Sequence, residues 1–158
     1  MGCPNRLGSV FVHLKVLMKE SPLRILYIDD DEICLTLTQL QLIRAEIHTE
    51  ITTDALEAVG ILSTQDLDLI LLDSVMPTID GLEFLQLMRA LHLEHPVVFY
   101  TGSDSKELQD SVSEFDVLGF LDKNANRMDL PMQLTDLYAK HRRPINRIDG
   151  FGEHRAAS

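Results

Sequence analysis

Short apolar runs alternate with longer segments of helical periodicity along most of the chain. Five runs of four to six residues are typical of strands, and they lie at 23–28, 47–51, 67–72, 97–100 and 117–121. Four further segments, at 33–44, 55–62, 81–91 and 130–141, carry apolar residues at helical spacing, and 103–114 is expected to form a short, polar helix. The pattern predicts five strands and five helices in strict alternation.

The run at 47–51 is a weak alternating strand, but the others are apolar at nearly every position, as LDLILL at 67–72 and VVFY at 97–100 show. Strands of this kind are typical of a parallel sheet that helices cover on both faces. Because crossovers between parallel strands are right-handed, few arrangements of the chain remain. We therefore predict a doubly wound α/β fold with a five-stranded parallel sheet.

Apolar residues at helical spacing mark the first two predicted helices. The apolar stripe of 33–44 is formed by positions 33, 35, 37, 40, 42 and 43. Thr53 or Asp54 is suited to cap the next helix. The residues expected on the inward face of that helix are Ala55, Leu56, Val59 and Leu62.

The two ends of the chain differ from this alternating region. The length of 158 residues and the hydrophobic content of 45% indicate one domain with a sizeable core, which we place at 23–142. Residues 1–22 are expected to form an N-terminal extension, either an extra helix or the product of a start assigned too early. Residues 143–158 have little apolar content and are expected to form a flexible tail.

Charge and cysteine content limit the classes of function. Residues 25–138 hold 22 acidic against 5 basic residues, a net charge of −17, so direct binding to nucleic acid is not expected. No apolar run approaches the roughly 20 residues of a membrane-spanning helix. Cys3 and Cys34 are too far apart in sequence for a CxxC metal or redox pair, and they form no disulfide framework, which favours a reducing, cytoplasmic location.

Residues with reactive or charged side chains follow four of the predicted strands. Asp29 and Asp30 follow the first, Asp73 the third, Thr101 the fourth and Lys123 the fifth. In an open α/β sheet, ligands bind beyond the carboxyl ends of the strands, so these groups are expected to meet at one edge. Each has an ordinary structural explanation by itself, such as an acidic helix start for the aspartate pair. Their order on successive strand ends is the specific signal.

This set of groups suits one kind of ligand. Clustered carboxylates repel one another, and a divalent cation relieves the repulsion. Mg²⁺ prefers oxygen ligands, binds through one or two carboxylates and leaves positions open for phosphate oxygens. A lysine and a threonine hydroxyl on the same edge would contact an anion beside the metal. The sequence therefore predicts a site for a phosphoryl group with Mg²⁺.

Four segments resemble the receiver domain of two-component response regulators, of the chemotaxis-regulator type. They are ILYIDD at 25–30, LILLDSVMPTIDG at 69–81, VVFYTG at 97–102 and GFLDK at 119–123. The resemblance covers about residues 22 to 142. It implies a flavodoxin-like fold with the strand order 2-1-3-4-5.

The resemblance also implies roles for the clustered residues. Asp73 would accept the phosphoryl group, and Mg²⁺ would be held by Asp29, Asp30, Asp73 and the backbone carbonyl of Val75. Such a domain is not an enzyme with a separate substrate, because it catalyses only its own phosphorylation and a slow dephosphorylation. An apolar residue at position 75 also suggests slow hydrolysis of the phosphoryl group.

Further residues would bind the phosphoryl group or report its presence. Thr101 and Lys123 would bind phosphoryl oxygens, and Thr101 with Phe120 would form the switch, with plain core packing as the alternative for Phe120. Asp31 lies one residue past the acidic pair and is expected to start a helix. Many receivers have proline after the lysine, and Asn124 stands there in this chain, which leaves the local loop geometry open.

The implied partners are a histidine kinase or a histidine phosphotransfer protein as donor, and a downstream protein as target. Homodimer formation is compatible with the resemblance. One alternative is a receiver that belongs to a larger regulator or hybrid kinase. Two less favoured alternatives are an interaction module without phosphorylation and a phosphatase of the haloacid-dehalogenase type. The phosphatase would require an aspartate two residues after the nucleophile, where this chain has Val75.

Overall fold

A computed structural model of the chain describes residues 21–102 and 106–142. Its centre is a five-stranded parallel sheet with the order β2-β1-β3-β4-β5. The strands are β1 (Arg24–Ile28), β2 (His48–Thr52), β3 (Leu69–Leu72), β4 (Val97–Thr101) and β5 (Val117–Asp122). This arrangement confirms the predicted fold class and strand order.

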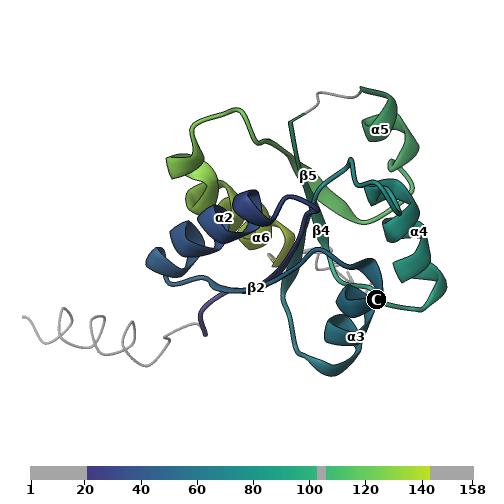
Figure 1. The fold of residues 1–158 in the computed structure, drawn as a ribbon, viewed down its shortest axis with the longest axis horizontal. Coiled ribbons are helices and arrows are strands. Elements are labelled where there is room, and N and C mark those ends of the chain that lie inside the picture. Colours follow the sequence, from purple (N-terminus) through teal and green to yellow (C-terminus); the bar gives the residue numbers. More distant parts are fainter. Residues whose placement is uncertain (1–20, 103–105, 143–158) are drawn as a thin grey trace, which may run out of the picture.

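Five α-helices and one 3₁₀ turn flank the sheet in the described ranges. They are α2 (Glu32–Arg44), α3 (Ala55–Thr64), α4 (Gly81–Ala90), α5 (Lys106–Ser111), η1 (Arg127–Asp129) and α6 (Leu130–Arg142). Helices α2 and α6 cover one face of the sheet, and α3, α4 and α5 lie on the other (Figure 1). Among the described residues, none of the helices has the length and apolar character needed to cross a membrane.

Two apolar clusters, one on each face, hold the layers together. On the α3/α4 side, Ile28, Leu72 and Phe99 of the central strands pack with helix residues such as Phe84 and Met88. On the α2/α6 side, alternate residues of the same strands pack with Leu35, Leu42, Leu130 and Leu134. Because both faces of β1, β3 and β4 are covered, these strands are apolar at nearly every position.

Aspartates start three of the helices. Asp31 caps α2 by accepting hydrogen bonds from two backbone N–H groups, which confirms its expected place at a helix start. Asp54, rather than Thr53, caps α3 in the same way. Asp80 caps α4 together with Glu83 in a capping box. An aspartate in the loop after β1, β2 and β3 therefore sets the residue at which the next helix begins.

The structure corrects the predicted inward face of α3. Leu56 is 78% exposed, and Ala58 is buried in its place together with Leu62. The cap at Asp54 fixes where the helix begins, and Ala58 and Leu62 are then one turn apart on the sheet side. Leu56 lies about 200° around the helix from Ala58 and so faces solvent.

The burial of residues in α2 also differs from what its apolar pattern suggests. Leu35 and Leu42 are buried, but the other four apolar positions of the stripe are at least half exposed, namely Ile33, Leu37, Leu40 and Ile43. The predicted helix at 103–114 is shorter, at Lys106–Ser111, and residues 103–105 lie outside the described ranges. The predicted extension at 1–22 and tail at 143–158 also fall almost entirely outside them.

Candidate functional site

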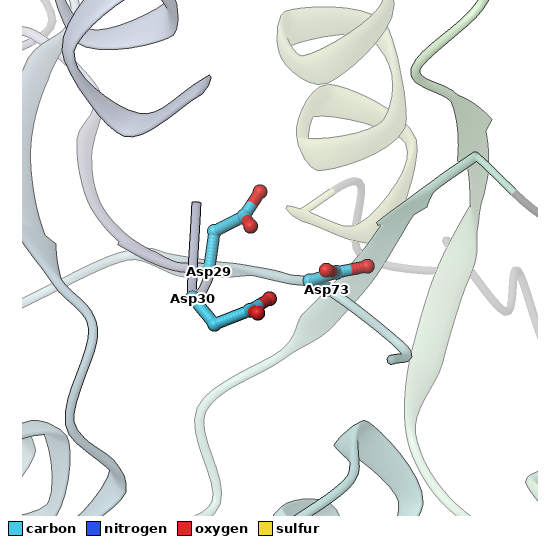
Figure 2. Close-up of side chains that lie close together, drawn as sticks. All are labelled: Asp29, Asp30 and Asp73. Carbon is cyan, nitrogen blue, oxygen red and sulfur yellow. The ribbon is translucent and has the colours of Figure 1, made fainter. Parts of the chain in front are cut away.

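Three carboxylates meet at the carboxyl edge of the sheet. Asp29 and Asp30 follow β1, and Asp73 follows the neighbouring strand β3. One oxygen from each lies within 4.8 Å of the others, and Figure 2 shows the three side chains gathered at the strand ends. Asp29 is fully buried and Asp73 is 5% exposed, whereas Asp30 is open to solvent. The parallel pairing of β1 with β3 thus brings together the residues that the sequence predicted would meet.

Lys123 brings a positive charge into this cluster from the end of β5. Its Nζ lies 2.5 Å from Oδ2 of Asp29 and 3.0 Å from Oδ2 of Asp73. Its side chain is 14% exposed, so these ion pairs are largely shielded from water. The backbone N–H of Lys123 donates to the carbonyl oxygen of Thr101, which fixes the start of the loop after β5.

Burial and neighbouring charges have opposite effects on the pKa values of Asp73 and Lys123. Burial raises the pKa of Asp73, and the charge of Asp29 adds to the increase, while contact with Lys123 only partly offsets it. Burial lowers the pKa of Lys123, but its hydrogen bonds and charge interactions with Asp29 and Asp73 outweigh that effect and raise it above the usual value. The lysine is therefore charged at neutral pH and partly neutralises the carboxylates.

Two neighbours hold the Asp29 carboxylate in place. The Tyr27 hydroxyl donates to Oδ2, and the Asp31 backbone N–H donates to Oδ1 at 3.0 Å. Burial and contact with Asp29 raise the pKa of Tyr27 far above its usual range, so the hydroxyl stays a donor. Sequence reasoning did not identify Tyr27, because a tyrosine in an apolar strand has the pattern of a core residue.

Thr101, at the end of β4, is mostly buried beside the carboxylates. Its hydroxyl forms a 2.5 Å hydrogen bond with the hydroxyl of Ser74, the residue directly after Asp73. Val75 has an exposed side chain, and its backbone N–H donates to Oδ1 of Asp73 at 3.4 Å. Sequence reasoning also missed Ser74. The pairing of β3 with β4 was the available signal, since it places the two strand ends side by side.

Phe120 lies in β5 on the same side of the sheet as Thr101. It is half-buried and stacks on Phe99, with the ring centroids 5.4 Å apart and the planes 7° from parallel. Phe99 and Phe120 are register partners across β4 and β5. The aromatic side chain therefore packs at the edge of the core, next to the strand that carries Thr101.

The structure shows how the loop after β5 is arranged where Asn124 replaces the proline of many receivers. The Asn124 side-chain amide donates to the carbonyl oxygen of Gly102 at 3.0 Å, and its backbone N–H donates to Oδ1 of Asp122 at 2.7 Å. These bonds connect the loop after β5 to the loop after β4. Lys123 reaches the carboxylates in this arrangement.

The donor set of the cluster fits a small divalent cation. It consists of carboxylate oxygens, which are hard ligands, and two of the three carboxylates are buried with a single lysine against them. The cluster therefore keeps an excess of negative charge that Mg²⁺ would neutralise. Asp30, the exposed member, lies where the cluster opens to solvent.

Comparisons with known proteins identify the family of the chain. A family model described as the response regulator receiver domain matches residues 25–135. The response regulator MprA of Mycolicibacterium vanbaalenii is 32% identical over 139 residues, which cover 85% of this chain and 57% of MprA. A CheY-like receiver domain protein from Methanospirillum hungatei has a TM-score of 0.68 and 25% identity, covering 76% of this chain and 96% of that one. TrrA from Thermotoga maritima, in complex with Mg²⁺ and BeF, has a TM-score of 0.63 and 23% identity, covering 73% of this chain and 98% of that one.

The chain belongs to the response regulator receiver domain family, and it is a receiver of the two-component type. It spans between 19% and 47% of the length of three further curated relatives, all of which are transcriptional regulators. Receivers are signalling domains that use Mg²⁺ and interact with histidine kinases and effectors, and the carboxylate cluster of this chain is suited to such an ion.

Proposed function

We propose that this domain accepts a phosphoryl group on Asp73 from a phosphohistidine of a kinase or phosphotransfer protein. The main support is the cluster itself, in which a buried carboxylate lies among two further carboxylates and one lysine amine. A nucleophile in such a position attacks phosphorus while the neighbouring charges stabilise the transferred oxygens. The role follows that of the matched family, which is a signalling domain rather than an enzyme that turns over a separate substrate.

In the proposed reaction, one Asp73 oxygen forms a bond to phosphorus as the bond to the donor imidazole nitrogen breaks. Mg²⁺ would be held by Asp29, Asp30, Asp73 and the Val75 carbonyl, and when bound it would neutralise charge on the transferred oxygens. The Lys123 amine would contribute a second positive charge, on the side of the phosphoryl group opposite Mg²⁺. The TrrA structure, determined with Mg²⁺ and BeF, shows that a protein of this fold binds such a pair.

The proposed output is a change of surface near β4 and β5. Thr101 would bind a phosphoryl oxygen through its hydroxyl, and Phe120 would adjust where it now stacks on Phe99. The acyl phosphate adds strong acceptors to the pocket, so it favours the conformation in which the threonine reaches inward. A downstream protein would then bind the changed surface.

The exposed apolar residues of α2 support a protein as phosphoryl donor. Ile33, Leu37 and Leu40 are spaced so that they lie on one side of the helix, and Ile33 is 73% exposed two residues after the cap at Asp31. The row formed by these three residues begins next to the carboxylate pocket. We propose that it contacts a helix of the donor protein and places the phosphohistidine over Asp73. A cytoplasmic location accords with such a donor and with the free thiol of Cys34.

Labelling from a small donor tests the acceptor without requiring the natural kinase. The full chain is incubated with phosphoramidate and Mg²⁺, and the intact mass is measured. We expect the wild type to gain one phosphoryl group and Asp73→Asn to gain none. Asp136→Asn, which changes an exposed carboxylate on α6, is the matched control and is expected to label normally. Labelling of the Asp73 variant at the wild-type level would overturn the assignment.

A further inference from the structure

The residue after the proposed phospho-acceptor carries a hydroxyl that contacts the switch threonine. The Ser74 and Thr101 hydroxyl oxygens are 2.5 Å apart, and Thr101 is 7% exposed. We propose that Ser74 is a positioning residue. It holds the Thr101 hydroxyl in the position that this group has before Asp73 is phosphorylated, and so sets how readily the domain switches. The inference rests on the proposed function, because it assumes that Thr101 binds the phosphoryl group.

Ser74 is held firmly enough to act in this way. Its carbonyl oxygen accepts a hydrogen bond from the Gly81 N–H at 3.1 Å. Gly81 packs so closely that an added Cβ would lie 2.9 Å from the Ser74 Cα and 2.5 Å from the Asp73 carbonyl oxygen. The start of α4 therefore supports the backbone of Ser74 from behind, and its hydroxyl has a fixed place from which to contact Thr101.

Residues of the loop after β5 restrain the backbone around Thr101. Its carbonyl oxygen accepts from the Lys123 N–H at 3.0 Å, and the carbonyl oxygen of Gly102 accepts from the Asn124 side chain at 3.0 Å. Because these bonds restrain the backbone, the proposed movement of the Thr101 hydroxyl toward a phosphoryl oxygen is a rotation of its side chain. That rotation breaks the hydrogen bond with Ser74.

The size of the effect follows from the type of bond. A hydrogen bond between two neutral hydroxyls changes an equilibrium constant by roughly two- to tenfold. A bond from a hydroxyl to a phosphoryl oxygen is charge-assisted and stronger. Ser74 would therefore shift the balance between the two positions of Thr101 without preventing the switch. Its removal should favour the phosphorylated conformation.

Binding of beryllofluoride with Mg²⁺, measured by isothermal titration calorimetry on the full chain, tests this role. We expect Ser74→Ala to bind roughly two- to tenfold more tightly than the wild type. Ser63→Ala, which removes an exposed hydroxyl on α3, is the matched control and should bind like the wild type. Ser74→Cys, with a weak thiol donor, provides the same comparison if the alanine variant is poorly folded.

A double-mutant cycle distinguishes positioning of Thr101 from a general structural effect. In a Thr101→Ala background, Ser74→Ala should leave the affinity unchanged, because no hydroxyl remains to be released. Equal or weaker binding by Ser74→Ala, or the same gain in both backgrounds, would overturn the proposal. If the wild type bound no beryllofluoride, the phospho-acceptor function would fail and this role with it. If the wild type binds beryllofluoride and this binding depends on Asp73, the comparison of Ser74→Ala with the wild type decides whether Ser74 has the proposed positioning role.

Discussion

Replacement of Lys123 by methionine tests the electrostatic balance of the carboxylate pocket. Methionine keeps most of the aliphatic volume of the side chain and removes the charge. Lys123 is the one cation that the described ranges place in contact with Asp29 and Asp73, at 2.5 and 3.0 Å. The variant therefore leaves two buried carboxylates without a positive partner.

The expected loss of stability is large. At these separations each ion pair has an attraction of about 6 kcal/mol at an effective dielectric constant near 20. Much of that attraction offsets the cost of removing the charges from water, and breaking a buried pair by removing one partner costs about 3–5 kcal/mol. For a domain of this size each kcal/mol lowers the melting temperature by about 2–4 °C. We expect Lys123→Met to melt about 6–20 °C below the wild type.

Thermal unfolding by circular dichroism at pH 7 with EDTA measures the difference. Lys140→Met is the control, because it removes an exposed charge from the last turn of α6 and should change the free energy of unfolding by no more than about 0.5 kcal/mol. Saturating Mg²⁺ should restore much of the loss in the Lys123 variant by supplying the missing positive charge. A Lys123 variant that melts within the range of the control would refute this account of the pocket.

Two further predictions concern the backbone and the buried hydroxyls. Gly81→Ala should lower both the melting temperature and labelling at the acceptor site, because its Cβ would lie 2.5 Å from the carbonyl oxygen of Asp73. Gly60→Ala is the control. Its Cβ would meet nothing within 4 Å, and it should stabilise α3 by up to about 1 kcal/mol. Unaffected labelling in the Gly81 variant would contradict this. Burial raises the pKa of Tyr27 and Tyr100, and it raises that of Tyr138 to about 12 with help from a carboxylate hydrogen bond. Because the unfolded chain releases these protons near pH 10 and the folded chain retains them, the free energy of unfolding should fall above about pH 10. A urea midpoint that stays constant from about pH 9 to pH 11 would be evidence against it.

The carboxylate cluster could be predicted from sequence because its geometry follows from the sheet alone. Asp29 and Asp73 each come directly after an apolar strand, and the carboxyl ends of parallel strands share one edge. No detail of side-chain packing was needed for that step. Lys123 lies on the same edge for the same reason, and its long side chain crosses the remaining distance to the carboxylates.

The orientation of the helices could not be predicted in the same way. Helix α2 has apolar residues on several sides, so periodicity does not identify the one that faces the sheet. In the structure Thr38 is buried and Leu37 is half exposed. Hydrogen bonds from Gln39 to the Thr49 carbonyl and from Gln41 to the Arg127 carbonyl flank the buried side of this helix. Such polar contacts involve residues ten or more positions apart on other elements, and no local pattern contains them.

The contacts that sequence reasoning missed share one property that bears on how receivers differ from one another. Tyr27 orients Asp29, Ser74 contacts Thr101, and Asn124 restrains the loop after β4, yet none belongs to the set of charged groups that the sequence motifs select. Preorganisation determines how much a fixed charge stabilises a transferred group, so residues that only position the charged groups also affect the rate and the switch. Two receivers with the same acidic residues, threonine and lysine can therefore differ in phosphoryl lifetime and switching balance through such neighbours alone.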